Sequence, residues 1–98
     1  MRRTPSTTGP VALSLSVTGV VQGVGFRPFV HRLAVARGLG GWVRNEAGEV
    51  RILVEGRKAD VRAFVNSLKP EAPPLARIDT LDERTLDPTH PAEFQILS

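Results

Sequence analysis

The chain has 98 residues, of which 41% are hydrophobic and 23% charged, a balance typical of one folded domain with a single core. It contains no cysteine and only two histidines, which excludes disulfides, thiolate nucleophiles and cysteine-based metal sites and disfavours a zinc site. No apolar run approaches the ~20 residues of a membrane-spanning helix. We therefore expect a domain that uses no metal ion and no cofactor and does not enter a membrane.

The net charge of +3 conceals an asymmetry along the chain. Residues 1–45 carry six arginines and no acidic residue, whereas residues 46–98 carry seven basic and ten acidic residues. An acid-free half favours binding of an anion, although an accidental surface distribution explains the charge equally well. Six arginines spread over 45 residues make a thin patch for nucleic acid, so we expect no nucleic-acid partner.

The first ten residues are polar and contain two prolines, which predicts a disordered tail over 1–10 and a folded domain over 11–98. The pair Arg2-Arg3 invites comparison with a twin-arginine export signal. No long apolar segment with a small-residue cleavage site follows it, so we expect a cytoplasmic protein.

The first half of the domain predicts a strand, a turn and a helix. Residues 11–18 alternate between apolar and small or polar side chains, which indicates a strand with one buried face. Residues 19–26 form a glycine-containing turn. Pro28 suits the first helical position, and the apolar residues after it recur at helical spacing until Gly38.

The second half predicts a hairpin, a second helix and two further strands. A short strand over 42–44 ends at Asn45, and residues 45–48 turn into a return strand over 49–55. Apolar residues at i, i+3, i+4 and i+7 predict an amphipathic helix over 61–68. The remaining pattern predicts a strand over 76–86, a turn over 87–91 and a short strand over 93–97.

This order, β-α-β-β-α-β plus a short fifth strand, predicts an α+β ferredoxin-like sandwich. Right-handed crossovers give an antiparallel sheet with strand order 4-1-3-2 and both helices on one face. Spacing alone does not determine whether Asn45 approaches the turn after the first strand.

The turn has the composition of an anion-binding loop. Two glycines just before a helix allow the backbone to turn its N–H groups inward, and the helix start adds unpaired N–H groups and a positive dipole end. Arg27 adds a planar, permanently charged guanidinium. The sequence therefore predicts a cradle for a phosphoryl group, formed by Gln22, Gly23, Val24, Gly25, Phe26 and Arg27.

Two blocks of sequence together resemble the acylphosphatase family over about residues 13–97. They are Val20-Val21-Gln22-Gly23-Val24-Gly25-Phe26-Arg27 and Gly41-Trp42-Val43-Arg44-Asn45. Pro28-Phe29-Val30 and Pro73-Pro74-Leu75-Ala76-Arg77-Ile78 are further similar to the N-terminal domain of the [NiFe]-hydrogenase maturation carbamoyltransferases.

The resemblance implies metal-independent hydrolysis of acyl phosphates to carboxylate and phosphate. The catalytic arginine of the family corresponds to Arg27 and its asparagine to Asn45, which would hold the attacking water. The narrower resemblance implies carbamoyl phosphate as the substrate, in hydrogenase maturation. The implied partners are an acyl phosphate or inorganic phosphate and further domains of a carbamoyltransferase.

Simpler roles exist for the same residues. Arg27 suits a solvated first helical turn, and Asn45 suits a left-handed position in the hairpin. A phosphate-binding regulatory module without turnover is a second hypothesis. A nucleic-acid-binding module is a third, because the block from Gly25 to Val30 is superficially similar to an RNA-recognition motif. Pro28 and the position of this block at a strand-to-helix junction argue against it.

Overall fold

The computed structural model describes residues 9–97. Most of the predicted tail, residues 1–8, lies outside the described residues, as does Ser98. Five strands and two helices follow one another along the chain, with these bounds: β1 Val11–Val20, α1 Phe26–Ala36, β2 Gly40–Glu46, β3 Glu49–Gly56, α2 Lys58–Leu68, β4 Arg77–Leu86 and β5 Phe94–Ile96.

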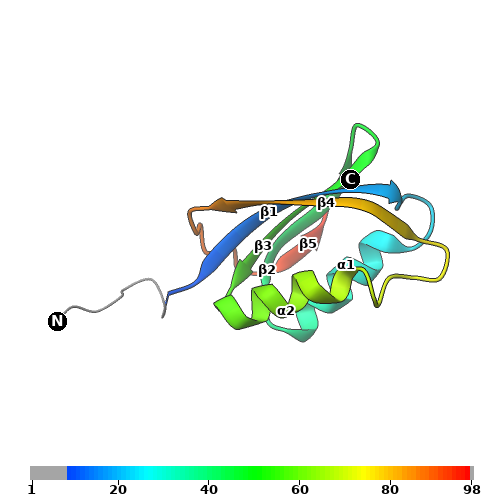
Figure 1. Ribbon diagram of the computed structural model, residues 1–98. Helices are drawn as coiled ribbons and strands as arrows, with labels where there is room; N and C mark the ends of the chain where they lie inside the picture. Colours follow the sequence, from blue (N-terminus) through cyan, green and yellow to red (C-terminus); the bar gives the residue numbers. More distant parts are fainter. Residues whose placement is uncertain (1–8, 98) are drawn as a thin grey trace.

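The strands form one sheet in the order β4-β1-β3-β2-β5 with both helices against one face (Figure 1). The first four strands are antiparallel and have the predicted order, so the ferredoxin-like arrangement is confirmed. The fifth strand joins β2 in parallel, which makes the whole sheet mixed. The sequence did not predict which edge β5 would occupy.

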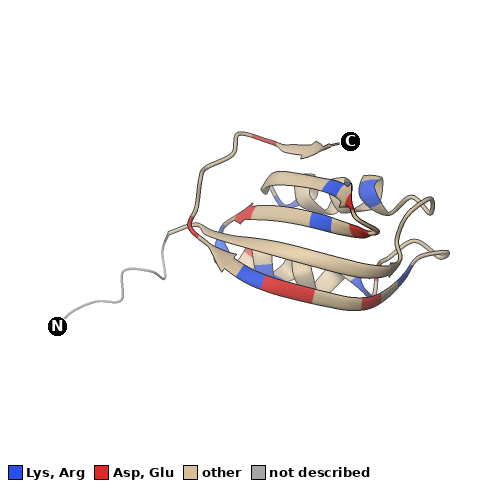
Figure 2. Ribbon diagram, turned by 90° about the horizontal axis from the view of Figure 1, so that it is seen from above, with Lys and Arg blue, Asp and Glu red and all other residues tan. Residues whose placement is uncertain are grey.

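Alternation along the strands divides the sheet into a covered and an open face. Leu15 of β1 pairs with Ile52 of β3, and Val17 pairs with Val50; none of these four side chains has exposed surface. They pack against buried residues of both helices, such as Val30. The residues of the opposite face are mostly polar, and neither helix of residues 9–97 covers it (Figure 2). No helix within residues 9–97 is both long and apolar enough to cross a membrane.

Some predicted boundaries differ from the structure for local reasons. Helix α1 begins at Phe26, with Gly25 as its N-cap, so Pro28 is the third helical residue and not the first. This position is still within the first turn, where a missing N–H is tolerated. Strand β2 begins at Gly40, before the predicted start at Trp42, because Gly40 and Gly41 already pair with β3. Gly41 packs so closely on β3 that an added Cβ would lie 1.9 Å from the Leu53 carbonyl oxygen.

The β2–β3 hairpin shows that the alternative role of Asn45, a left-handed position in the turn, is wrong. The two turn residues are Ala47 and Gly48, with φ of 50° and 84°, and Asn45 is a strand residue paired with Val50. Asn45 therefore does not supply the left-handed position. A two-residue turn with both residues at positive φ matches the right-handed twist of the strands it joins.

Candidate active site

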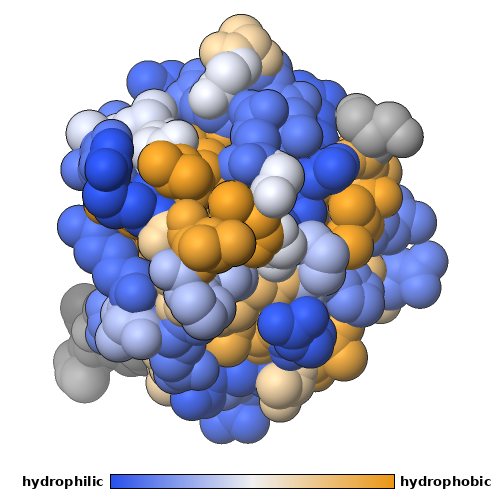
Figure 3. Space-filling view, turned by 90° about the vertical axis from the view of Figure 1, so that its right-hand side faces the viewer, coloured by the Kyte–Doolittle hydropathy of each residue, from blue (hydrophilic) through white to orange (hydrophobic). Residues whose placement is uncertain are grey.

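The predicted phosphate loop lies at the end of the sheet where β1, β2 and β5 end. Strands β2 and β5 are parallel, and both β1 and β2 are antiparallel to β3, so all three point to the same end. Figure 3 looks onto this end, where hydrophobic surface lies among hydrophilic side chains. Val20 and Leu75, which are 41% and 76% exposed, lie in segments that meet there.

The loop from Gln22 to Gly25 presents main chain and little side chain. Gly23 and Gly25 have φ of 73° and 79°, and a Cβ added at either would meet nothing within 4 Å. Glycine is required here by backbone conformation and not by crowding. Of the other two loop residues, Gln22 is exposed and Val24 packs against the core.

The amides of this loop are free to bind an anion. Among residues 9–97, none of the backbone N–H groups of residues 22–27 donates to another protein group, and the first such bond of the helix runs from Phe29 N to the Gly25 carbonyl over 3.2 Å. Phe26 is 1% exposed and its ring packs 5.6 Å from that of Phe29, so its side chain belongs to the core. The arrangement has the free donors and helix dipole of a phosphate cradle.

Arg27 is half-buried on the first turn of α1, and its guanidinium points to the end of the chain. Its Nη1 donates to the carbonyl oxygen of Leu97 over 3.1 Å, and the Leu97 N–H donates to the Val43 carbonyl over 2.8 Å. Arg27 is therefore not a freely solvated residue. One of its five N–H groups is engaged, which leaves enough for a bidentate contact with an oxyanion.

Asn45 lies on the covered face of β2, two residues beyond Val43. Its partner across the ladder, Val50, is wholly buried. The Asn45 Oδ1 atom is buried and has no hydrogen-bond partner within the described chain. The structure thus brings Asn45, Arg27 and the loop to one end of the sheet, and within residues 9–97 no hydrogen bond joins the two side chains.

The acidic residues of the β2–β3 hairpin, at this end of the sheet, project from the open face. Glu46 pairs with Arg44 over 2.8 Å and approaches Arg51 over 3.7 Å, and Glu49 accepts a hydrogen bond from Ser16. All five residues belong to the open face of the sheet. The two hairpin carboxylates therefore do not share a face of the sheet with Asn45.

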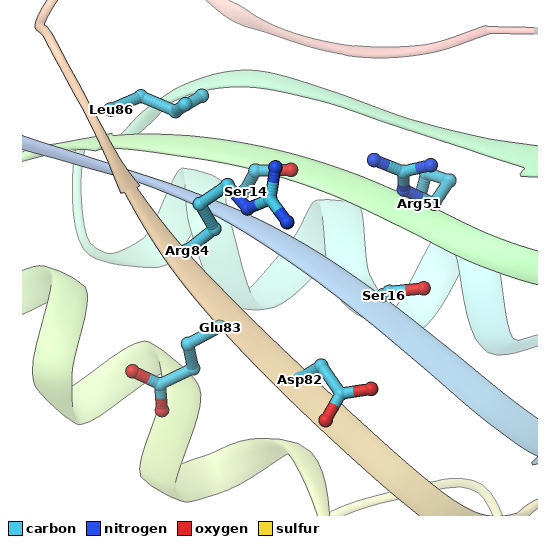
Figure 4. Close-up of a pocket in the computed structure, with 7 residues that line it drawn as sticks. All are labelled: Ser14, Ser16, Arg51, Asp82, Glu83, Arg84 and Leu86. Carbon is cyan, nitrogen blue, oxygen red and sulfur yellow. The ribbon is translucent and has the colours of Figure 1, made fainter.

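A shallow hollow on the open face does not fit the same chemistry (Figure 4). Asp82 and Glu83 offset the charge of Arg51 and Arg84 there, and Glu83 is bound by Arg62 of α2. The strands beneath the hollow already pair their backbone amides, so it offers no free N–H groups to an anion. Its lining consists of Ser14, Ser16, Arg51, Asp82, Glu83, Arg84 and Leu86. Among residues 9–97 no group of three or more His, Asp or Glu side chains is placed to hold a metal ion.

The Leu97 carbonyl is a feature of this site that sequence reasoning missed. The segment around it was predicted only as a terminal strand. A main-chain acceptor has no sequence signature, and its partnership with Arg27 depends on the parallel docking of β5, which the sequence did not predict.

The Acylphosphatase family model matches residues 13–96 of this chain. The chain belongs to the acylphosphatase family. It is 41% identical over 81 residues to the acylphosphatase of Bacillus pumilus, covering 82% of this chain and 90% of that protein. It is accordingly an enzyme of the acylphosphatase class, which hydrolyses acyl phosphates.

Larger proteins also contain this domain. The chain is 56% identical over 68 residues to the probable carbamoyltransferase HypF of Methanocaldococcus jannaschii, covering 69% of this chain and 9% of that protein. The crystal structure of full-length HypF in the phosphate- and nucleotide-bound form superimposes with a TM-score of 0.89 at 34% identity, over 97% of this chain and 13% of that one. The chain thus spans about a tenth of the length of these carbamoyltransferases.

Proposed function

We propose that the loop of residues 22–27 binds the phosphoryl group of an acyl phosphate, that Arg27 grips two of its oxygens and that Asn45 orients the attacking water. The observation that carries the proposal is the convergence of free loop amides, a half-buried guanidinium and a buried, unpartnered amide oxygen at one end of the sheet. An unsatisfied buried acceptor is unfavourable for stability, and such groups in native proteins call for an explanation.

In the proposed reaction, water attacks phosphorus while the bond from phosphorus to the acyl oxygen breaks. An acyl phosphate dianion and water give a carboxylate anion and dihydrogen phosphate, so both atoms and charge balance. Phosphoryl transfer spreads charge over three equatorial oxygens, and positioned N–H donors stabilise that charge. Asn45 is a weak base, but a carboxylate is a good leaving group, so orientation of the water suffices. The scheme uses no metal ion and no cofactor.

The substrate we propose is carbamoyl phosphate, used in hydrogenase maturation. Its support is the similarity to HypF carbamoyltransferases, which at 56% identity exceeds the 41% identity to the Bacillus pumilus acylphosphatase. The remaining domains of a carbamoyltransferase are the proposed protein partners. We propose the cytoplasm as the compartment.

The test is turnover of carbamoyl, acetyl and benzoyl phosphate by the purified chain in the presence of EDTA. We expect hydrolysis of all three, with the highest kcat/KM for carbamoyl phosphate. Arg27→Ala and Asn45→Ala should each lower kcat/KM by at least ~100-fold with the circular dichroism spectrum retained. Arg32→Ala and Asn66→Ala, which change exposed residues of the same types on α1 and α2, are the matched controls.

Three results would contradict parts of this proposal. Full activity in both site variants would remove the residue assignment. Phosphate binding without turnover would favour the regulatory module. Equal kcat/KM for carbamoyl and benzoyl phosphate would remove the proposed substrate preference.

A further inference from the structure

The segment after β4 crosses the whole sheet before it reaches Arg27. Residues 87–97, here called the C-terminal strap, leave β4 at one edge and pass the end of the sheet to reach the opposite edge, where β5 pairs with β2 (Figure 2). The last described residue of the strap is Leu97, whose carbonyl accepts the Arg27 hydrogen bond. The position of the guanidinium therefore depends on how the strap is held.

The first anchor of the strap is the carboxylate of Glu55 on β3. The Thr89 N–H donates to Oε1 over 2.8 Å and the His90 N–H to Oε2 over 2.9 Å, so both oxygens are used. Glu55 is only 5% exposed, and hydrogen bonds to a buried charge are stronger than neutral ones. His90 adopts a φ of 56°, a left-handed conformation that is uncommon for residues other than glycine.

Four further contacts hold the strap between this anchor and the candidate active site. A Cβ added at Gly40 would lie 2.7 Å from the Pro91 carbonyl oxygen, so the strap passes directly against β2. The Gly41 N–H donates to the Glu93 carbonyl over 3.0 Å, and Phe94 is buried in the core at 5% exposure. The final contact is the bond from Leu97 to Val43. Contacts to β3, to β2 and to the core thus hold the strap along its length from Glu55 to Arg27.

We infer that the C-terminal strap positions Arg27 and that Glu55 is a positioning residue, although it lies at the far end of the sheet from the phosphate loop. Glu55 is five residues along β3 from Val50, the partner of Asn45, which places it roughly 16 Å away. It touches neither substrate nor the reacting atoms. Its effect on catalysis passes through the strap, because the Leu97 carbonyl selects one orientation of the guanidinium. The inference rests on the proposed role of Arg27.

The main test replaces Glu55 by glutamine, which presents an NH₂ group to one of the two strap amides and so releases it. We expect kcat/KM to fall roughly 3- to 30-fold, with weaker competitive inhibition by inorganic phosphate. The Arg27 Nε–H resonance in a ¹H–¹⁵N spectrum should shift, which a purely structural role of Glu55 would not cause. Thr89→Pro removes the N–H group that donates to Glu55 Oε1, so it breaks one of the two anchoring hydrogen bonds from the strap side. This variant should reproduce the result.

Val61→Ala is the matched control for lost stability. Val61 is 1% exposed on α2, a helix that the strap does not cross, so this variant should be destabilised without a shift of the Arg27 resonance. In an Arg27→Lys background, Glu55→Gln should have little further effect on phosphate binding or kcat/KM, because coupled residues are not additive.

The outcomes separate this inference from the proposed function. An unshifted Arg27 resonance in Glu55→Gln, with kcat/KM no lower than in Val61→Ala, overturns the inference. Full additivity of the two substitutions does the same. A shifted resonance with unchanged turnover leaves the strap intact as a positioning element and refutes the catalytic role of Arg27 instead.

Discussion

Asn45 stands directly opposite Val50 in the β2–β3 ladder, so its amide projects onto the covered face of the sheet. Val50 has no exposed surface, and Asn45 Oδ1 is buried without a partner in the described chain. An apolar side chain would be the more stable choice at such a position. Asn45 therefore fits a residue kept for chemistry at the expense of stability.

The first prediction follows from this conflict. Asn45→Val removes the unsatisfied oxygen and places a good strand former beside Val50, so the free energy of unfolding should rise by about 1 kcal/mol. Turnover of acyl phosphate should fall at least ~100-fold in the same variant. Chemical denaturation and a steady-state assay measure the two effects. A less stable Asn45→Val protein would show that the amide has a structural role.

The sequence predicted the four-stranded fold because its signals are local. Alternation in residues 11–18 and helical spacing in 61–68 depend on burial of one face, and both patterns survive in the structure. The position of the predicted phosphate loop could also be read from the sequence. Glycines just before a helix indicate a turn of the backbone whatever the surrounding fold. The role of the loop in binding remains a prediction.

The parts that sequence could not predict are those made by distant main-chain contacts. Nothing in residues 93–97 specifies parallel pairing with β2, and nothing marks the Leu97 carbonyl as a partner of Arg27. In the sequence, Glu55 is one polar residue of an alternating strand. Only the structure shows that it accepts hydrogen bonds from the strap. The alternative hairpin role of Asn45 was wrong because the turn was placed two residues too early.

The second prediction concerns Gly25, where the backbone conformation requires glycine, and Gly41, where close packing requires it. Gly25→Ala adds a methyl group in open space at a φ of 79°, so it should fold with a loss of about 1–2 kcal/mol and weaker phosphate binding. Gly41→Ala should fail to fold, since its Cβ would lie 1.9 Å from the Leu53 carbonyl oxygen. Thermal unfolding and phosphate titration distinguish them. A stable Gly41→Ala protein would contradict the close packing of β2 on β3.

The third prediction is a stabilising change in the β2–β3 turn. Ala47 has a φ of 50°, a left-handed conformation that asparagine adopts more readily, and it precedes Gly48. Ala47→Asn should therefore raise the free energy of unfolding by about 0.5–1 kcal/mol without changing turnover. Ala92→Asn, at an exposed position outside the strands, is the control. Equal effects of the two substitutions would argue against relief of backbone strain.

The fourth prediction is that the ion pair between Arg62 of α2 and Glu83 of β4 makes a pH-dependent contribution to the free energy of unfolding. Arg62 Nη1 and Nη2 donate to the two carboxylate oxygens of Glu83 over 3.0 Å each, and these hydrogen bonds lower the pKa of Glu83 below its usual 4.5. A lowered pKa in the folded state stabilises the protein above pH 4.5 and loses that effect as pH falls through the folded-state value. Because both side chains are largely in water, the contribution should be below about 1 kcal/mol. Glu83→Gln should thus be slightly less stable than the wild type at pH 7 and equally stable near pH 2, measured by denaturant unfolding. A difference that persists unchanged at low pH would mean that the glutamate acts through packing and not through its charge.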